Sequence, residues 1–272
     1  MLTELKEADA GGRIAEIFAE VRAAYATPYV SSIHRHLATR PGVLEWAWEA
    51  AAPAFRDGRA QETAWRIAAG VALAPLERIP REALAIWRVG PGDVGTIAAI
   101  AESFTRVAPL NLVLGGIVRE LLSGNAAGAR LPERRGSFAA PAPLPPPPSM
   151  VDAAEATEEV RALLALFRSG DGATAFVPGL YRMLAHWPGL LGHLAVELGP
   201  RFRSEEKARA AAMLIGQIDA AIPSIRAGLP LPMLPGPGPE EAAHLVRMID
   251  GYRVTSPEMI LFGRLIREAL PG

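Results

Sequence analysis

The sequence contains no cysteine. This absence excludes disulfides, thiolate zinc sites, iron–sulfur clusters and any enzyme that relies on a cysteine nucleophile or a peroxidatic dithiol. It is also typical of proteins that work in a reducing compartment, so we expect a cytoplasmic protein. The function must therefore depend on other side chains.

An excess of charge of either sign is missing as well. The 28 Lys and Arg residues nearly balance the 29 Asp and Glu residues, and the formal net charge is −1. Without a polybasic field, we expect neither nucleic acid nor an anionic membrane as a partner. The longest apolar run, 107–118, is interrupted by Pro109 and Asn111. It is too short to cross a bilayer, so we expect it to form a buried helix.

The short motifs of common enzyme classes are missing too. The sequence has no P-loop, no dinucleotide-binding glycine fingerprint, no Gly-x-Ser-x-Gly and no His-Glu-x-x-His. His34 and His36 lie two residues apart, which on a helix places them on different faces and disfavours a shared metal. We therefore predict no metal site and no bound cofactor.

The sequence does contain a repeat. The segment "SIHRHLATRPGVL" (32–44) is echoed by "GLYRMLAHWPGLL" (179–191) at an offset of 147, and "APLNLVLGGIVRELLSG" (108–124) is echoed by "SPEMILFGRLIREALPG" (256–272) at 148. Matches at nearly the same offset near both ends of each half of the chain predict a duplicated unit of about 110 residues. Matching positions include Arg35/Arg182, Leu37/Leu184, Ala38/Ala185, Pro41/Pro188, Gly42/Gly189, Leu44/Leu191, Phe55/Phe202, Pro109/Pro257, Gly115/Gly263, Arg119/Arg267 and Glu120/Glu268.

Apolar residues recur at helical spacing in both units, so we predict an all-α protein with roughly five helices in each unit. We place the first repeat at 13–124, a Pro-rich linker at 125–156 and the second repeat at 157–272. Four successive prolines, Pro145–Pro148, favour an extended spacer. Start signals for helices stand at Thr157, Ser204, Pro239 and Ser256.

Two such units joined by a spacer would most simply pack as a pseudo-twofold dimer, with a ligand cleft at their junction. Arg35 and Arg182 occupy equivalent places in this arrangement. They either clamp a substrate carboxylate near the axis or, as we favour for a residue kept in both copies, pair with an acid such as Glu120 or Glu268 of their own unit.

Positions that differ between the copies are better candidates for contacts with an asymmetric ligand. Asn111 is a polar residue inside an apolar run, and its amide could orient a water or a ligand carboxylate, or could bond to neighbouring backbone. We predict that substrate-binding side chains are drawn from Ser31, Ser32, His34, Asn111, Tyr181 and Ser256.

The segments "RAAYATPYVSSIHRHLATRPGVLEWAWEAAAPAF" and "YRMLAHWPGLLGHLAVELGPRF", together with "VAPLNLVLGGIVRELLSG", resemble the group I (DL-) 2-haloacid dehalogenases. The resemblance covers nearly the whole chain. It implies two helical repeats with a site between them and hydrolysis of a 2-halocarboxylate by direct attack of water. It also implies that no metal or cofactor takes part. A positioned carboxylate base contributes about 10²–10⁴-fold to such a reaction.

The resemblance also implies where the catalytic side chains stand, and here the chain departs from the family. The family's Asp, immediately before the Tyr-Arg pair of the second repeat, corresponds to Leu180, and its water-positioning Asn before a Pro corresponds to Ala108. Leucine cannot deprotonate water, so the catalytic residues remain unknown. Glu62, Asp171 and Glu197 are other candidate bases, although we expect each to be a solvated surface acid.

Two functions follow from these observations. The first is a divergent 2-haloacid dehalogenase-like protein that takes a small carboxylate as its ligand. The second is a non-catalytic helical protein that binds a small carboxylate or a protein partner. The helical alkylhydroperoxidase-like enzymes are excluded in their usual form by the lack of cysteine. Whether the chain forms a homodimer is left open.

Overall fold

The structure is a computed structural model that describes residues 3–124, 138–169 and 176–272. Every regular element in these ranges is a helix, and the only β-type pairing there is an isolated bridge between Ser169 and Phe176. The all-α prediction is confirmed. The helices are α1 (Gly12–Tyr25), α2 (Ser32–Leu37), α3 (Val43–Arg56), α4 (Arg59–Gly70), α5 (Arg81–Ile86), α6 (Pro91–Leu122), α7 (Glu158–Ala165), α8 (Gly179–Leu184), α9 (Pro188–Leu198), α10 (Glu205–Arg226) and α11 (Pro239–Ala269), with 3₁₀ turns η1 (Glu7–Asp9) and η3 (Gly199–Arg201).

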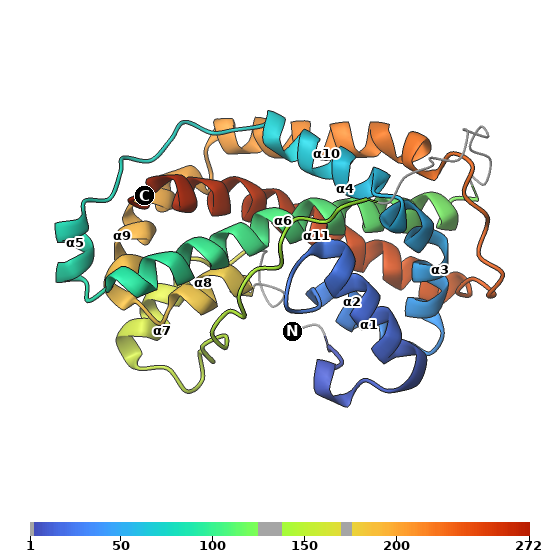
Figure 1. Cartoon of the computed structure of the whole chain (residues 1–272), viewed down its shortest axis with the longest axis horizontal. Coiled ribbons are helices and arrows are strands. Elements are labelled where there is room, and N and C mark those ends of the chain that lie inside the picture. Colours follow the sequence, from blue (N-terminus) through green and yellow to red (C-terminus); the bar gives the residue numbers. More distant parts are fainter. Residues whose placement is uncertain (1–2, 125–137, 170–175) are drawn as a thin grey trace.

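The two long helices, α6 and α11, lie side by side through the middle of the protein (Figure 1). Each begins with a proline in its first turn, Pro91 or Pro239, where the missing N–H costs no helical hydrogen bond. The backbone N–H of Gly90 also donates to Asp93 Oδ2 at 2.8 Å, which caps α6. The strongest apolar stretch of the chain therefore forms a central, largely buried helix.

By length and composition alone, α6 is also apolar enough to cross a membrane, but 67% of the relevant window is buried inside the protein. The core helix of a globular protein passes the same test. Burial of this window agrees with the buried helix that was predicted for 107–118.

The contact between α6 and α11 is reciprocal. A Cβ placed on Gly115 of α6 would lie 2.9 Å from Cγ2 of Ile249, and one placed on Gly263 of α11 would lie 3.1 Å from the carbonyl oxygen of Ala101. Gly115 and Gly263 are 148 residues apart in sequence, and so are Ala101 and Ile249. Small residues therefore allow the two helix backbones to approach closely at two equivalent points.

Two ion pairs across the same contact follow the same rule. Arg119 pairs with Asp250, and Arg267 pairs with Glu102. Both the arginines and the acids are related by the offset of 148. Exchange of equivalent partners is the pattern that a pseudo-twofold axis produces, because residue i contacts j and the equivalent of j contacts the equivalent of i. This reciprocity supports the pseudo-twofold packing, which stays a prediction.

The shorter helices lie at opposite ends of the long pair. In Figure 1, α1, α2 and α3 cover one end of the pair, and α7, α8 and α9 cover the other. Helices α4 and α10 lie along the top of this view. Arg59, in the first turn of α4, donates to the carbonyl oxygen of Ala227 beyond α10 at 2.8 Å. Roughly five helices were predicted for each unit, and the first unit contains six because the short α5 lies between α4 and α6.

Helix starts follow the sequence signals in three of four cases. Thr157 accepts a hydrogen bond from the N–H of Val160, Ser204 accepts one from Lys207, and α11 starts at Pro239. The predicted start at Ser256 is wrong, because this residue lies inside α11. The proline that follows Ser256 removes one helical hydrogen bond but is itself buried, and burial of the apolar turns after it offsets that loss.

The described part of the Pro-rich segment, 138–156, contains no regular secondary structure. Phe138 lies directly over Gly58, whose φ of +81° favours glycine. Further along, the carbonyl oxygen of Val151 accepts from Arg182 Nε at 3.0 Å. The segment therefore contacts residues of both predicted units along its path.

Candidate functional site

Three of the predicted site residues meet in a buried polar cluster between α2 and α6. Ser31 directly precedes α2, and its Oγ lies 2.8 Å from His34 Nδ1 and 2.9 Å from Asn111 Oδ1. A hydroxyl has one hydrogen, which goes to the amide oxygen, so His34 Nδ1 carries the hydrogen that Ser31 accepts. His34 Nε2 is then a bare acceptor. Neither this atom nor the hydroxyl of Tyr25 has a hydrogen-bond partner among the described residues.

Burial determines the charge of this cluster. His34 has no exposed surface, and desolvation lowers the pKa of its imidazole to about 3. Desolvation likewise raises the pKa of the Tyr25 phenol well above its usual value. The cluster is therefore neutral at physiological pH and is suited to hydrogen bonding rather than to proton transfer.

The neutral state of His34 predicts sensitivity to acid. Its pKa is lower in the folded protein than in the unfolded chain, where it is about 6.5. The unfolded chain therefore binds the proton first, and folding stability falls as the pH drops below about 6.5. We expect urea unfolding between pH 7.5 and 5 to show this loss in the wild type. A His34→Phe variant should lose less over the same range, and equal slopes for the two proteins would contradict the assignment.

The second unit has a polar cluster at the corresponding place. The hydroxyl of Tyr181 on α8 donates to Glu258 Oε1 on α11 at 3.3 Å, and Lys207 Nζ of α10 lies 3.4 Å from Glu258 Oε2. Only 3% of Glu258 is exposed, and burial raises the pKa of its carboxyl while the Lys207 ammonium lowers it. Among the described residues, Glu258 is the one acid whose side chain is buried.

The two clusters occupy related positions in the repeat. His34 corresponds to Tyr181 at offset 147, while Glu258 corresponds at offset 148 to Leu110, the neighbour of Asn111. One aromatic ring of each cluster stacks on an aromatic side chain of its own unit. Tyr25 stacks on Phe55 in the first unit, and Tyr181 stacks on Phe167 with a centroid distance of 4.3 Å in the second. The first cluster is neutral and the second contains an ion pair.

The remaining predicted site residues lie elsewhere. Ser32 donates to Glu4 and accepts from the Tyr252 hydroxyl at 2.8 Å, apart from the cluster that contains Ser31. Ser256 is buried within α11. Leu180 and Ala108, which stand at the positions of the family's Asp and Asn, are buried apolar side chains.

The arginines before the Pro-Gly breaks do not make the expected ion pairs. Arg35 pairs with Glu4 at 2.5 Å, and Arg182 donates to the linker carbonyl of Val151. Glu120, offered as a partner of Arg35, instead pairs with Arg226 at 3.3 Å. The specific partners were wrong because the N-terminal segment and the linker, which lie outside the repeat pattern, cover these arginines.

Two of the acids considered as alternative bases are at least partly exposed. Glu62 is exposed on α4 and Glu197 is partly exposed on α9, whereas Asp171 lies outside the described residues. The buried acid Glu258 was missed, because Ser256-Pro257-Glu258 was interpreted as a helix start. Its signal was available: a single charge between Pro257, which matches Pro109, and the apolar run from Met259 to Phe262.

A cavity of about 280 Å³ lies between α4, α6, α11 and the linker. It is therefore located where the two predicted units meet. Trp65 and Ala68 of α4, Pro141 of the linker, and Glu102, Thr105, Arg106, Arg264 and Arg267 of the long helices line it.

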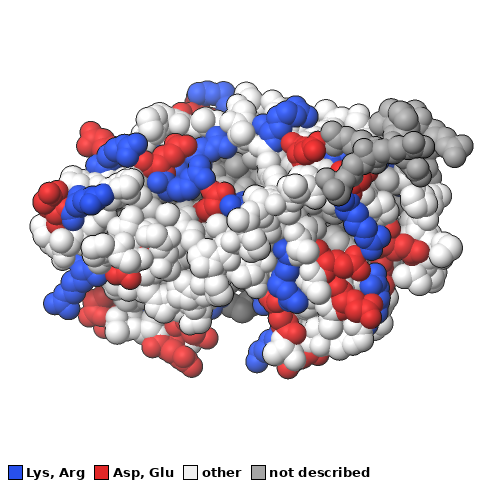
Figure 2. All heavy atoms as spheres, viewed as in Figure 1, with Lys and Arg blue, Asp and Glu red and all other residues white. Residues whose placement is uncertain are grey.

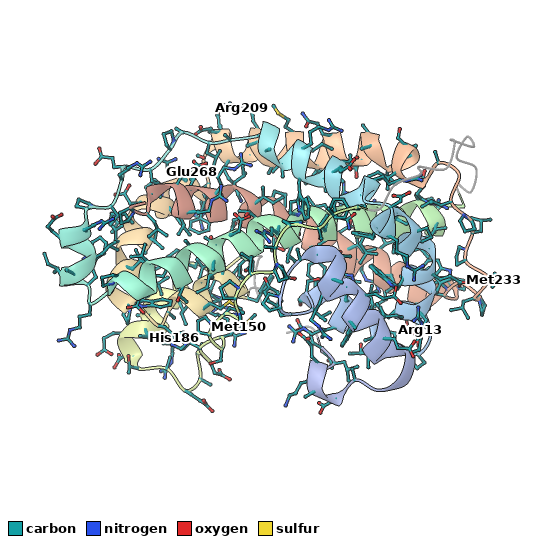
Figure 3. All side chains as sticks on the ribbon, viewed as in Figure 1. Arg13, Met150, His186, Arg209, Met233 and Glu268 are labelled. Atoms are coloured by element: carbon teal, nitrogen blue, oxygen red, sulfur yellow. The ribbon has the colours of Figure 1, made fainter. Side chains whose placement is uncertain are left out.

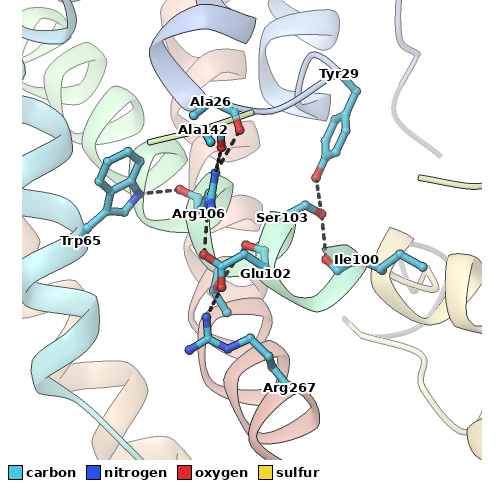
Figure 4. Close-up of polar contacts among 10 residues, drawn as sticks. Ala26, Tyr29, Trp65, Ile100, Glu102, Ser103, Arg106, Ala142 and Arg267 are labelled. Carbon is cyan, nitrogen blue, oxygen red and sulfur yellow. Dashed lines mark hydrogen bonds and ion pairs between the residues drawn. The ribbon is translucent and has the colours of Figure 1, made fainter. Parts of the chain in front are cut away.

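Three guanidinium groups face one carboxylate in this cavity, which leaves an excess of positive charge. Glu102 Oε1 accepts from Arg106 Nε at 3.0 Å, and its other oxygen accepts from Arg267 (Figure 4). Arg264 donates to the carbonyl oxygens of Ala68 and Val71, at 2.6 and 2.8 Å, at the end of α4. The cavity thus combines an apolar wall with fixed cationic donors, which is the chemistry that binds a small carboxylate.

The cavity also has a fixed geometry. The indole N–H of Trp65 donates to the carbonyl oxygen of Arg106 at 3.0 Å, and Arg106 Nη1 donates to the linker carbonyl of Ala142 at 2.8 Å (Figure 4). Positive and negative side chains are otherwise interspersed over this face of the protein (Figure 2). A local excess of arginine is therefore a feature of the cavity.

The overall architecture is that of known dehalogenases. A crystal structure of a D-2-haloacid dehalogenase mutant is similar, with a TM-score of 0.81, 17% sequence identity, and coverage of 99% of this chain and 96% of that one. Two further structures, a mutant D-2-haloacid dehalogenase with D-2-CPA and a D-2-haloacid dehalogenase with L-LA, have TM-scores of 0.74 at 18% identity and the same coverage. The chain has a haloacid dehalogenase-like fold.

No protein family profile and no curated protein matches the sequence.

Proposed function

We propose that this protein binds a small 2-substituted carboxylate in the arginine-lined cavity between α4, α6 and α11. The observation that carries the proposal is the excess of guanidinium groups in a cavity with one apolar wall, at the junction of the two predicted units. Arginine presents paired N–H donors that match the two oxygens of a carboxylate. Trp65 and Ala68 offer an apolar surface to a short 2-substituent.

The fold gives independent support for this class of ligand. Similar structures of D-2-haloacid dehalogenases include complexes with D-2-CPA and with L-LA. The sequence resemblance implies the same ligand class and a site between repeats. Because Leu180 and Ala108 cannot supply a base and an amide, binding without dehalogenation by the usual route is the function that fits the side chains best.

Hydrolytic dehalogenation by direct attack of water is the second candidate, and Glu258 is the observation that favours it. This buried carboxylate is hydrogen-bonded to Tyr181, the residue directly after Leu180. A raised pKa is what a general base near neutral pH needs. Its ion pair with Lys207 opposes this role, since the pair occupies the oxygen that would accept a proton from water.

Calorimetric titration with both enantiomers of 2-chloropropionate, and with 2-hydroxypropionate, tests binding. We expect Arg267→Met to weaken binding by about 10- to 100-fold, the loss of one charge-assisted contact. Arg119→Met is the matched control. Arg119 corresponds to Arg267 in the repeat and makes the equivalent ion pair, but it does not line the cavity. Equal loss in both variants, or no binding by the wild type, contradicts the proposal.

Halide release separates the two candidates. Binding without release from either enantiomer would support the first. Release that disappears in a folded Glu258→Gln variant would establish the second. Release that survives this substitution would assign the chemistry to another base.

A further inference from the structure

The arginine-lined cavity between α4, α6 and α11 has a single aromatic side chain among its described lining residues, that of Trp65. The indole N–H of Trp65 already donates to the carbonyl oxygen of Arg106 at 3.0 Å, so it is not available to a ligand. Indole has no second donor and no acceptor. What Trp65 offers to the cavity is therefore the apolar surface of its rings.

Contacts outside the cavity hold this indole in place. The ring of Phe138 packs against it, with ring centroids 6.1 Å apart and an interplanar angle of 44°. Phe138 in turn lies over Gly58, where a Cβ would come within 2.4 Å of Cγ of Phe138. Because the indole is oriented before a ligand arrives, binding does not have to order it, which lowers the entropic cost of a contact with its rings.

The cavity is larger than a three-carbon acid fills. Its volume of about 280 Å³ is close to the roughly 300 Å³ at which pockets for drug-sized ligands begin. A methyl group at C2 would therefore leave much of the wall formed by Trp65, Ala68 and Pro141 uncovered. A planar ring at C2 would cover more of this wall, and it could take the offset or edge-to-face arrangement that aromatic rings prefer.

The guanidinium groups differ in how many donors they keep for a ligand. Arg106 donates through Nε to Glu102 and through Nη1 to a linker carbonyl, and both Nη atoms of Arg264 donate to carbonyls at the end of α4. The guanidinium of Arg267 makes one described hydrogen bond, from Nη1 to Glu102, which leaves Nε and Nη2 for a carboxylate. Trp65 of α4 and Arg267 of α11 approach this part of α6 from different helices (Figure 4). A ligand between them would place its carboxylate at Arg267 and its 2-substituent against Trp65.

We propose that the cavity selects 2-substituted carboxylates whose substituent is a planar aromatic ring, and that Trp65 is the residue that selects them. This inference rests on the proposed function, because the carboxylate must bind at Arg267 for the ring to reach Trp65. It adds the chemical class of the 2-substituent, a ring of phenyl size joined directly to C2. Hydrolysis of the ligand is not part of it.

Calorimetric titration of the full chain with three 2-hydroxy acids tests the selection. The acids are 2-hydroxypropionate, 2-hydroxy-2-phenylacetate and 2-cyclohexyl-2-hydroxyacetate, which share the carboxylate and contain no halide to release. We expect the phenyl acid to bind at least about tenfold more tightly than the methyl acid, because an aromatic contact adds to the area that is buried. It should also bind more tightly than the cyclohexyl acid, which has a ring of similar size without π electrons. Equal binding of the phenyl and cyclohexyl acids would overturn the proposal without the need for any variant.

Substitutions at Trp65 assign the preference to its indole. Trp65→Leu should reduce the ratio of phenyl to methyl affinity by about tenfold, and Trp65→Phe, which keeps an aromatic ring, should restore most of it. Trp187→Leu is the matched control, because Trp187 is a half-buried tryptophan at the start of α9 that does not line the cavity. Circular dichroism shows that each variant is folded. An unchanged ratio in folded Trp65→Leu would refute the role of Trp65.

The same titrations separate this inference from the proposed function. If all three acids bind the wild type equally and lose affinity in Arg267→Met, the selection of aromatic rings is wrong and the proposed carboxylate site stands. If none of the acids binds, the proposed site is wrong, and the selection is overturned with it.

Discussion

Gly263→Leu should lower the free energy of unfolding by about 3 kcal/mol, because overpacking a tight helix contact typically costs this much. A Cβ at this position would lie 3.0 Å from Cγ2 of Thr105 and 3.1 Å from the carbonyl oxygen of Ala101. The second of these atoms belongs to the α6 backbone and cannot move without moving the helix. Part of the loss is offset, since leucine favours helix over glycine by up to about 1 kcal/mol.

Gly251 provides a control on the same helix. It is exposed in α11, and a Cβ placed there would have no atom within 4 Å. Gly251→Leu should therefore stabilise the protein slightly. Urea unfolding followed by circular dichroism measures both variants. If Gly263→Leu were as stable as Gly251→Leu, α6 and α11 would not approach closely in solution.

The reciprocal position should also resist substitution. A Cβ at Gly115 would lie 2.9 Å from Cγ2 of Ile249. This methyl group is fixed to a branched Cβ, and isoleucine in a helix has one strongly preferred χ1, so it cannot simply turn away. We therefore expect Gly115→Ala to destabilise the protein as well, which urea unfolding would measure.

The sequence alone predicted the helices well because they depend on local signals. Spacing of apolar residues, the caps at Thr157 and Ser204, and the proline that starts α11 all act within a few residues. One interior proline was misjudged for the same reason. Pro257 breaks a local rule, and only its burial within a long packed helix explains why α11 continues through it.

Contacts between distant segments could not be predicted in this way. The match of Arg119 with Arg267 indicated equivalent roles, but their partners depend on where α6 and α11 cross. Arg35 pairs with Glu4 of the N-terminal segment, which no repeat pattern includes. The cavity that contains Arg264 likewise needs three helices and the linker in place.

Three of the predicted site residues lie together, but their role in binding a substrate stays a prediction. Ser31, His34 and Asn111 were selected as polar positions that differ between the repeats, and the structure brings them together. The same comparison aligned Asn111 with Met259 and therefore overlooked Glu258, the residue just before Met259. Because the two clusters are displaced by one position along the long helices, a strict residue-by-residue comparison does not find Glu258.

Lys207→Met should destabilise the protein strongly at pH 7, by about 2–4 kcal/mol, because it leaves the Glu258 carboxylate buried without its cation. A loss at the upper end of the range for buried pairs is not expected, since Lys207 is 17% exposed. The hydrogen bond from Tyr181 would remain as the only described partner of the carboxylate. Arg209→Met, two residues along α10, removes an exposed pair with Glu205 and should change stability by less than about 0.5 kcal/mol (Figure 3).

The pH dependence of this loss identifies its cause. Burial already raises the pKa of the Glu258 carboxyl, and removal of the ammonium raises it further. A raised carboxyl pKa contributes stability that is complete below the unfolded value of about 4.5 and is lost as the pH rises through the folded value. The deficit of Lys207→Met relative to the wild type should therefore grow from pH 4.5 to 7. The acid sensitivity from His34 is common to both proteins and cancels in the difference.

A second substitution separates charge from packing. Glu258→Gln keeps a hydrogen-bond acceptor for Tyr181 but cannot ionise, so the Lys207→Met/Glu258→Gln double variant should lose the pH-dependent part of the deficit. Any pH-independent remainder would measure packing around the methionine. If the deficit of Lys207→Met were flat with pH and equal in the double variant, Glu258 would not be a buried carboxylate held by Lys207. Its candidacy as a base would then have no support.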